Sequence, residues 1–483
     1  MRGSNHLSVL VFRVWIVYAL MALVFCTVAC MKKTILLMLC LVTTPVMALD
    51  LLDTYRLALA NDPSWQATLN TYLADQQNEG IAYGALLPNV GLSGSISRNR
   101  FEPDSLPTTL SYTSKQAAVA VRQPLFRPEL WAQYQQAKSA SSLNDANLQR
   151  DQQAFIQRVA EAYFDVLRAE ATVDALSAEE RALSRQRTMM NERYKAGLIA
   201  RTDVTESLAQ YQNAVANRIA GEIAVTSARE ALSAILGQSV ERLAALRDDV
   251  LYQAPYPLEM SAWVDLARKR NPQIDAARFA YQAALRNRDV KAAGRLPKLD
   301  LVGNAVWNKQ GLQTQSYNDG RSLSAGLELS VPLYTGGQLT LSTRQAAYQV
   351  DAARNQIDAA ERQAVAQART SFLNLQADRS RLEARQEAVR SGETVAEASQ
   401  VGYELGVRNI VDVLLAQRNA FAARRDYVNS RYDYVINVIR LRAAAGQLST
   451  NDLAEVNQWL TEDQAISGPS KIAKTGTALD QTP

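Results

Sequence analysis

Apolar and polar residues follow two different periods along this chain. A helical period covers residues 51–83 and 262–293, and each of these segments ends at a glycine and proline signal. After that signal, apolar residues recur at every second position instead. We therefore predict two helices, with local breaks or helix starts at Pro63 and Pro272, and a β-strand after each helix.

Four segments have the alternation of β-strands, two in each half of the chain. In the first segment of each half, the alternate positions are Val90, Leu92, Gly94 and Ile96, and Leu299, Leu301, Gly303, Ala305 and Trp307. The clearest alternation covers residues 323–331, and a weaker one covers residues 117–121. We predict that these later strands stop at Pro124 and Pro332.

The predicted strands have one apolar face and one face of small or polar residues. At about 10 residues each, they match strands with lipid outside and water inside. On this pattern alone, the edge of a soluble β-sandwich stays open as an alternative.

A long helix is predicted after the second strand of each half. Residues 338–402 contain no proline, so at about 1.5 Å per residue this helix approaches 100 Å. Apolar residues recur at steps of three, four or seven, as in a coiled-coil seam. Each long helix ends at a glycine turn, at residues 194–197 and 403–406, and a returning helix runs to Gly237 or Gly446.

The two halves repeat each other at a distance of 209 residues. The repeated positions are Pro63, Leu87, Pro88, Leu92, Gly94, Tyr163, Tyr194, Gly197, Asp203 and Gly237, echoed at Pro272, Leu296, Pro297, Leu301, Gly303, Phe372, Tyr403, Gly406, Asp412 and Gly446. A period near 200 residues indicates a duplicated, domain-sized unit. We predict two structural repeats (49–240 and 261–460), a linker (241–260), a disordered polar tail (461–483) and a leader (1–48).

The leader has the parts of a secretory signal peptide. A charged start at Met31, an apolar run over residues 35–42 and the small-residue end at Ala48 predict cleavage before Leu49, with translation beginning at Met31. The upstream stretch from Val14 to Met31 is long enough to span a membrane, and its residues 27–30 loosely resemble a lipoprotein cleavage site. A membrane-anchored or lipidated form therefore stays open as an alternative.

The composition without the leader excludes several chemistries. All three cysteines and the only histidine lie in residues 1–48, and the remaining chain has 48 basic and 48 acidic residues. Disulfides, cysteine nucleophiles, histidine bases and the usual zinc, haem and iron–sulfur ligand sets are excluded. We expect no cofactor, and a neutral chain argues against nucleic acid as a partner.

The strands set a requirement on assembly. No apolar run after the leader is long enough for a membrane helix, so a chain that crosses the bilayer must do so as a closed barrel. Four strands cannot close one, because the smallest common barrels have eight. The membrane hypothesis therefore requires that subunits pool their strands.

Four motifs, one of which occurs once in each half, give the chain a family resemblance over residues 49–460. They are the segments 84–94, 197–204 and 406–414 and the two strand ends, Gln123 to Phe126 and Val331 to Tyr334. The chain resembles the TolC family of outer-membrane export ducts. The resemblance implies a mixed α and β fold: a homotrimer with a 12-stranded transmembrane β-barrel and a 12-helix periplasmic tunnel, the α-helical barrel. It also implies a periplasmic adaptor and an inner-membrane ABC or other efflux transporter as partners, outer-membrane lipid around the barrel, and no catalysis.

The resemblance also implies a gate at the periplasmic end of the tunnel. By motif position, Tyr403 pairs with Asp203, Arg408 pairs with Thr202, and Asp412 projects into the lumen as a ring of three carboxylates. Such a ring favours cations. A second acidic position of the family is Leu415 here, so a single acidic ring is expected and strong block by multivalent cations becomes doubtful.

Simpler roles stay open for the same residues. Thr202 and Asn409 occupy positions of helix N-caps, with Asp203 and Asp412 in the first helical turn. Phe126, Trp131 and Tyr334 are candidates for a membrane-interface belt, with helix packing as the alternative for Trp131.

Two other protein classes remain. A lipid-anchored multidrug efflux duct shares the fold but begins at an acylated cysteine, and a soluble periplasmic adaptor has long helices but lacks two amphipathic hairpins. The sequence leaves open whether the exported substrate is a protein or a small molecule.

Overall fold

The computed structural model describes residues 48–101, 109–248, 250, 256–310 and 320–467. Residues 1–47 of the expected leader, with its cysteines and histidine, lie outside the described residues, and so does the tail from residue 468. Residues 49–466 form one compact unit, and the account below concerns that unit.

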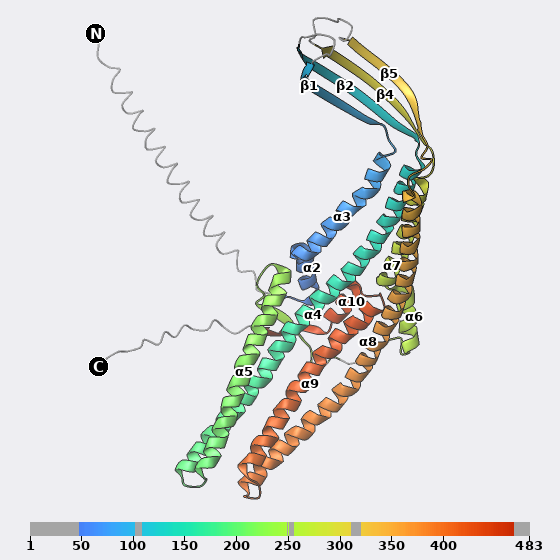
Figure 1. The fold of residues 1–483 in the computed structure, drawn as a ribbon. Helices are drawn as coiled ribbons and strands as arrows, with labels where there is room; N and C mark the ends of the chain where they lie inside the picture. The colour runs from blue at the N-terminus through green and yellow to red at the C-terminus, as the bar shows by residue number, and fades with distance from the viewer. Residues whose placement is uncertain (1–47, 102–108, 249, 251–255, 311–319, 468–483) are drawn as a thin grey trace, which may run out of the picture. The chain divides into compact units, whose positions relative to one another are not determined.

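The elements occur twice in the same order (Figure 1). The first series is α2 (Leu51–Asn61), α3 (Pro63–Gly84), β1 (Asn89–Phe101), β2 (Leu110–Phe126), α4 (Pro128–Lys195) and α5 (Arg201–Leu236). The second series is α6 (Met260–Arg270), α7 (Pro272–Ala293), β4 (Lys298–Gln310), β5 (Gly320–Ser330), α8 (Gln338–Glu404) and α9 (Ile410–Ala444). The long helices α4 and α8 contain 68 and 67 residues, which confirms the predicted length.

Both predicted helix breaks are confirmed, and each ties two helices together end to end. Asp62 caps α3 and Asn271 caps α7, in each case with proline as the first helical residue. Asn61 Nδ2 donates to the carbonyl of Leu236 at the end of α5 (3.0 Å), and Asn271 Nδ2 donates to the carbonyl of Ala444 at the end of α9 (3.0 Å). As a result, α3 continues the line of α5, and α7 continues that of α9.

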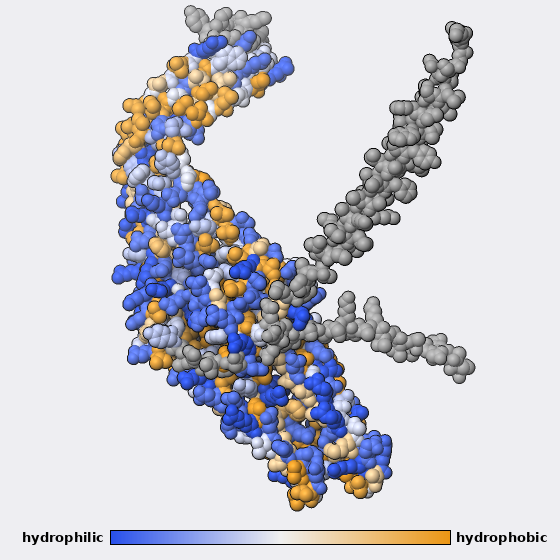
Figure 2. Space-filling view, turned by 180° about the vertical axis from the view of Figure 1, so that it is seen from behind, coloured by the Kyte–Doolittle hydropathy of each residue, from blue (hydrophilic) through white to orange (hydrophobic). Residues whose placement is uncertain are grey.

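The four predicted strands form one antiparallel sheet in the order β1-β2-β4-β5. The prediction that β2 stops at Pro124 is wrong, because β2 continues to Phe126. The pairing of β2 with β4 shifts register between Pro124 and Phe126, which accommodates a proline that has no N–H to donate. The other strand, β5, ends at Ser330, before Pro332, as predicted. In the part of the chain that the structure describes, β1 and β5 are open edges of this sheet. Figure 2 shows hydrophobic residues gathered over the sheet.

A second, smaller sheet differs from the prediction for the linker and the tail. Strand β3 (Arg242–Leu246) lies in the expected linker, and β6 (Leu460–Ser467) pairs with it where a disordered tail was predicted. Between α9 and β6 stands the short helix α10 (Thr450–Asn457). Non-local pairing with β3 gives residues 460–467 their structure, and their polar sequence does not signal it.

The main core lies where the small elements pack on the long helices. Tyr163 and Phe164 of α4 are fully buried and meet edge to face at 5.4 Å. The Tyr163 hydroxyl donates to the carbonyl of Ala244 in β3 (2.8 Å), which attaches the small sheet to α4. Among the described residues, no helix is both long enough and apolar enough to cross a membrane.

Candidate functional site

The free ends of the two long helical hairpins have the same backbone geometry. Gly197 and Gly406 both have φ of +74°, a left-handed conformation that favours glycine. The amide of Leu198 donates to the carbonyl of Arg193, and the amide of Val407 donates to the carbonyl of Gly402, each at 2.9 Å. Two matched turns therefore present the same positions of the repeat at one end of the tunnel helices.

A separate hydrophobic cluster holds the two hairpin ends together. Its buried members are Leu183 and Met190 from α4, Ala214 from α5, and Ile410, Val413 and Leu414 from α9. Tyr403 and Val204 pack against it from the side. Apolar packing thus joins the ends within one protomer.

The two predicted polar links have other partners within this chain. The Tyr403 hydroxyl donates to Met190 Sδ (3.6 Å), and the Arg193 guanidinium lies 5.1 Å from the centre of the Tyr403 ring. Arg408 folds back over Gly402, where an added Cβ would lie 3.2 Å from its stem, and donates to the buried Ser399 (2.9 Å). Pairing of Tyr403 with Asp203, and of Arg408 with Thr202, stays a prediction for another state or for contacts between copies.

The first turns of α5 and α9 combine capping with exposed acids. Asn409 accepts a hydrogen bond from the amide of Asp412 (2.8 Å), so its capping role is confirmed. The capping role of Thr202 is wrong, because α5 begins at Arg201 with Ala200 as N-cap, two residues earlier than a Thr202 cap requires. Thr202 Oγ1 instead lies 3.4 Å from Asp203 Oδ1. Asp203 and Asp412 lie in first turns as predicted, and Asp412 and Leu415 are both exposed.

The aromatic residues expected at the membrane interface lie where the sheet meets the long helices. Phe126 ends β2 with 54% of its surface exposed, and Tyr334 follows β5 with 88% exposed. Trp131 packs on Tyr134 with ring centres 5.8 Å apart, and Tyr134 also meets Tyr83 at 5.7 Å. Helix packing is therefore one role of Trp131, and the interface role of Phe126 and Tyr334 stays a prediction.

Sequence reasoning missed a charged cluster at the same junction, which we call the Asp300 cluster: Arg122, Arg127 and Asp300. Asp300 lies in β4 and is almost fully buried. Its carboxylate accepts hydrogen bonds from Arg122 in β2 (2.7 Å) and from Nε of Arg127, the residue that follows β2 (2.8 Å). Arg122 also pairs with the exposed Glu328 of β5 (3.1 Å). The only sequence signal is an acid between two leucines of an alternating strand. Because β2 and β4 come from different repeats, this cluster joins the repeats.

Farther along α4, burial raises the pKa values of three carboxyl groups. Burial raises the pKa of Glu170, against the opposing effect of Arg229 on α5. Burial likewise raises the pKa of Asp174 against Arg181, and that of Glu179 against Arg425 and Arg418 on α9. These acids weaken the packing of α4 when they are charged.

Comparison with known proteins agrees with this architecture. The sequence model of the family described as outer membrane efflux protein matches residues 54–238 and, 209 residues later, residues 263–447. The chain belongs to this family. It is 34% identical over 425 residues to the outer membrane protein TolC of Vibrio cholerae, covering 86% of this chain and 95% of that protein. It is 29% identical over 446 residues to the alkaline protease secretion protein AprF of Pseudomonas aeruginosa, covering 90% and 91%.

Solved structures of the family share the fold. The outer membrane protein VceC of Vibrio cholerae superposes with a TM-score of 0.69 at 20% identity, covering 82% of this chain and 96% of that one. CusC superposes with a TM-score of 0.72 at 16% identity, covering 83% and 92%. The chain is thus an outer-membrane channel protein of the kind that forms exit ducts for type I secretion or efflux, with a periplasmic tunnel.

Proposed function

We propose that three copies of this chain pool their strands into one 12-stranded barrel and their long helices into one tunnel, which conducts solutes passively and catalyses nothing. The observation that carries this proposal is the four-stranded sheet with one open edge from each repeat. An open edge exposes unpaired N–H and C=O groups, which cannot face lipid. Pairing β5 of one copy with β1 of the next satisfies both edges.

The internal repeat gives the register of that pairing. Arg122 of β2 faces Asn89 of β1, and Ser330 of β5 faces Lys298 of β4, so Ser330 holds the place of Arg122. In the seam between the repeats, Arg122 faces Val302, and the β1 residue 209 positions before Val302 is Ser93. We therefore expect Ser330 to face Ser93 of the neighbouring copy.

Cysteine cross-linking tests this register, since residues 49–483 contain no cysteine. A variant with Ser93→Cys and Ser330→Cys should form a covalent trimer on oxidation, because facing residues bring Cβ atoms to about 4.5–5.5 Å. The matched control, Ser95→Cys with Ser330→Cys, moves one cysteine by two residues on the same face and should cross-link far less. A monomer in detergent that leaves planar bilayers without conductance would refute the assembly.

We further propose that the tunnel is gated at its helical ends by Thr202, Asp203, Tyr403 and Arg408, with Asp412 as the acidic ring. Support comes from the two matched turns, which hold these residues within one or two helical turns of the tip. Tyr403→Phe combined with Arg408→Ser should raise single-channel conductance in planar bilayers. Ser399→Ala is the control, since it removes the partner of Arg408 within the chain but leaves Arg408 free to act between copies. An unchanged closed-state conductance in the double variant would contradict the latch.

A periplasmic adaptor and an inner-membrane transporter are the proposed partners. Leu198, Leu405 and Val407 expose 73–77% of their surface at the hairpin ends, where a partner protein would cover them. Relatives include AprF and the proteases secretion protein PrtF of Dickeya chrysanthemi, at 27% identity, and also the outer membrane efflux protein BepC of Brucella suis, at 25%. Comparing secreted proteins and drug sensitivity after gene deletion separates secretion from efflux.

A further inference from the structure

Three cavities along α4 share lining residues and form one continuous furrow. The first, of about 490 Å³, lies among α4, α7, α8 and α9 and shares Asn437 and Arg440 with the second, of about 270 Å³. The second shares Asp165, Arg168 and Asp433 with the third, of about 500 Å³. On α4 the furrow extends from residue 150 to residue 172, roughly 33 Å at 1.5 Å per residue.

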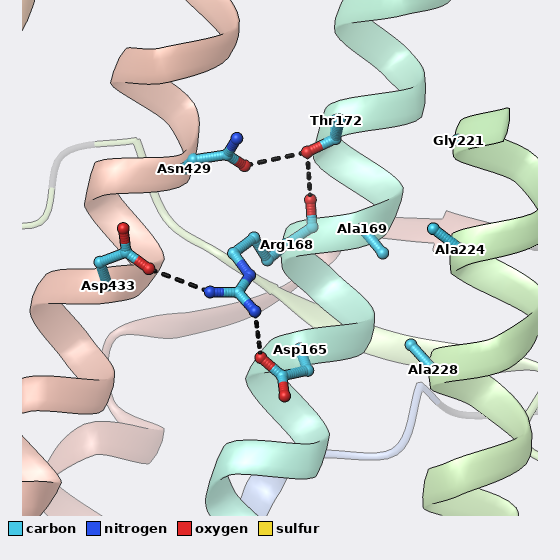
Figure 3. A pocket seen from close by; sticks show the side chains of 9 residues that line it. All are labelled: Asp165, Arg168, Ala169, Thr172, Gly221, Ala224, Ala228, Asn429 and Asp433. Carbon is cyan, nitrogen blue, oxygen red and sulfur yellow. Dashed lines mark hydrogen bonds and ion pairs between the residues drawn. The ribbon is translucent and has the colours of Figure 1, made fainter. Parts of the chain in front are cut away.

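The furrow opens on one side of the helical layer. Figure 3 looks onto its third cavity, where Arg168 pairs with Asp165 (2.7 Å) and Asp433 (3.0 Å), and the segments of the small sheet lie behind α4. Tyr163, on the other side of α4, contacts β3. In the proposed duct we assign this open side to the lumen, since the small sheet would otherwise project from α4 into the channel and obstruct it.

Side-chain amides dominate the lining of the first cavity. They are Gln153, Gln157, Asn271, Gln273, Gln363, Gln367, Asn374 and Asn437. Among the residues that the structure describes, neither acidic nor aromatic ones line this cavity. Among the described residues, the side chains of Gln153, Gln363 and Gln367 make no hydrogen bond within the chain, so their donors and acceptors are available to a ligand.

The amides stand at a spacing that matches an extended peptide. Gln153 and Gln157 on α4, and Gln363 and Gln367 on α8, are each four residues apart, which is about 6 Å along a helix. Two residues of an extended chain span about 6.6 Å. A side-chain amide has both a donor group and an acceptor, as a peptide backbone does. Gln157 Nε2 donates to Glu161 (3.0 Å), so Gln157 contributes its acceptor oxygen, whereas the other three glutamines contribute both groups. The lack of large apolar side chains argues against small apolar ligands, which prefer hydrophobic pockets.

We propose that these four glutamines, which we call the amide furrow, bind the backbone of an extended polypeptide during export. The inference rests on the proposed function and names the substrate class that the duct wall recognises. Hydrogen bonds to backbone amides do not depend on the peptide sequence and are individually weak. The exported polypeptide can therefore bind along the wall and still dissociate readily.

Current blockades in planar bilayers test this proposal with the full trimer. The probe is an unfolded, uncharged polypeptide of Gly, Ser and Asn, added on the barrel side. Polyethylene glycol of the same hydrodynamic radius is the reference. The test variants are Gln153→Leu with Gln367→Leu, and Gln153→Ala with Gln367→Ala, which break no hydrogen bond within the chain. The control is Gln149→Leu with Gln376→Leu, on the same two helices but outside the furrow.

We expect both test variants to shorten the polypeptide blockade by roughly threefold or more, as the loss of several weak hydrogen bonds predicts. The polyethylene glycol blockade and the control variant should stay unchanged. An unchanged polypeptide blockade, or an equal change for both polymers, would overturn the amide furrow while the proposed duct stands. Absence of conductance in the unmodified trimer would overturn the duct, and this inference with it.

Discussion

Helices α3 and α7 have the same length and the same place in the repeat, but different surroundings. Both contain 22 residues. Helix α7 packs against both α4 and α8, whereas α3 packs against α4 and, within the described part of the chain, has no comparable packing against a second long helix. Ile81 on α3 is 68% exposed, and Val290, at the same repeat position on α7, is 6% exposed. In the proposed trimer, we therefore expect α8 of a neighbouring copy to cover α3.

The largest expected effect concerns the two glycines that end α5 and α9. Gly237 and Gly446 both have φ of +70°, but an added Cβ would have ordinary contact at Gly237 and would collide with the Arg270 carbonyl at Gly446. Gly446→Ala should destabilise the fold by about 3 kcal/mol or more, and Gly237→Ala by about 1 kcal/mol. Thermal unfolding followed by circular dichroism in detergent measures the stability of both variants. Equal losses of stability in the two variants would contradict the difference between the repeats.

The next effect concerns the corner between sheet and helices. The Asp300 cluster joins β2 to β4 where the two repeats meet. In the proposed contact between copies, where β5 pairs with β1, the equivalent positions are Gly91 in place of Asp300 and Ser330 in place of Arg122. Asp300→Asn leaves two arginines without their carboxylate and should cost about 2 kcal/mol. The control Glu328→Gln removes an exposed partner of Arg122 and should cost about 0.5 kcal/mol. Chemical denaturation in detergent compares the two, and a harmless Asp300→Asn would show that the corner does not depend on charge.

A matched pair of substitutions addresses α3 and α7 directly. Val290→Ser should destabilise the protomer by about 1.5 kcal/mol, because the position is buried within the chain. Ile81→Ser should leave the protomer within about 0.5 kcal/mol but lower the temperature at which the trimer dissociates on a gel. If Ile81→Ser left trimer dissociation unchanged, α3 would not lie in the interface.

The smallest expected effect is a pH dependence of stability that a buried acid on α4 causes and an exposed acid on α8 does not. Burial raises the pKa of Glu179, so its charged form destabilises the fold above that pKa, and the cost disappears as the pH falls toward the ordinary value of the group. Glu179→Gln should therefore stabilise the fold at pH 7 by less than about 1 kcal/mol and reduce the gain in stability on acidification. The control is Glu383→Gln on α8, whose side chain is 71% exposed, and it should change neither quantity. Thermal unfolding at pH 7 and pH 5 measures both variants, and an unaltered pH dependence in Glu179→Gln would contradict this assignment.

The sequence alone determined the local elements and the repeat. Helix breaks at Pro63 and Pro272, turns at Gly197 and Gly406, and alternation in the strands depend on backbone limits and on burial of one face, and these act over a few residues. The family resemblance rested on the same short motifs. These features can be predicted from the sequence because their causes lie within a few neighbouring residues.

Tertiary structure decided what depends on partners far apart in the sequence. Strand β6 exists because β3 lies beside it, Arg408 turns to Ser399 across the space that Gly402 leaves, and Asp300 is buried because two arginines converge on it. The exposure of Ile81, against the burial of Val290, follows from which helices surround α3 and α7. Polar residues do not reveal such partners in the sequence, because their free energy depends on which groups the fold brings within a few ångströms.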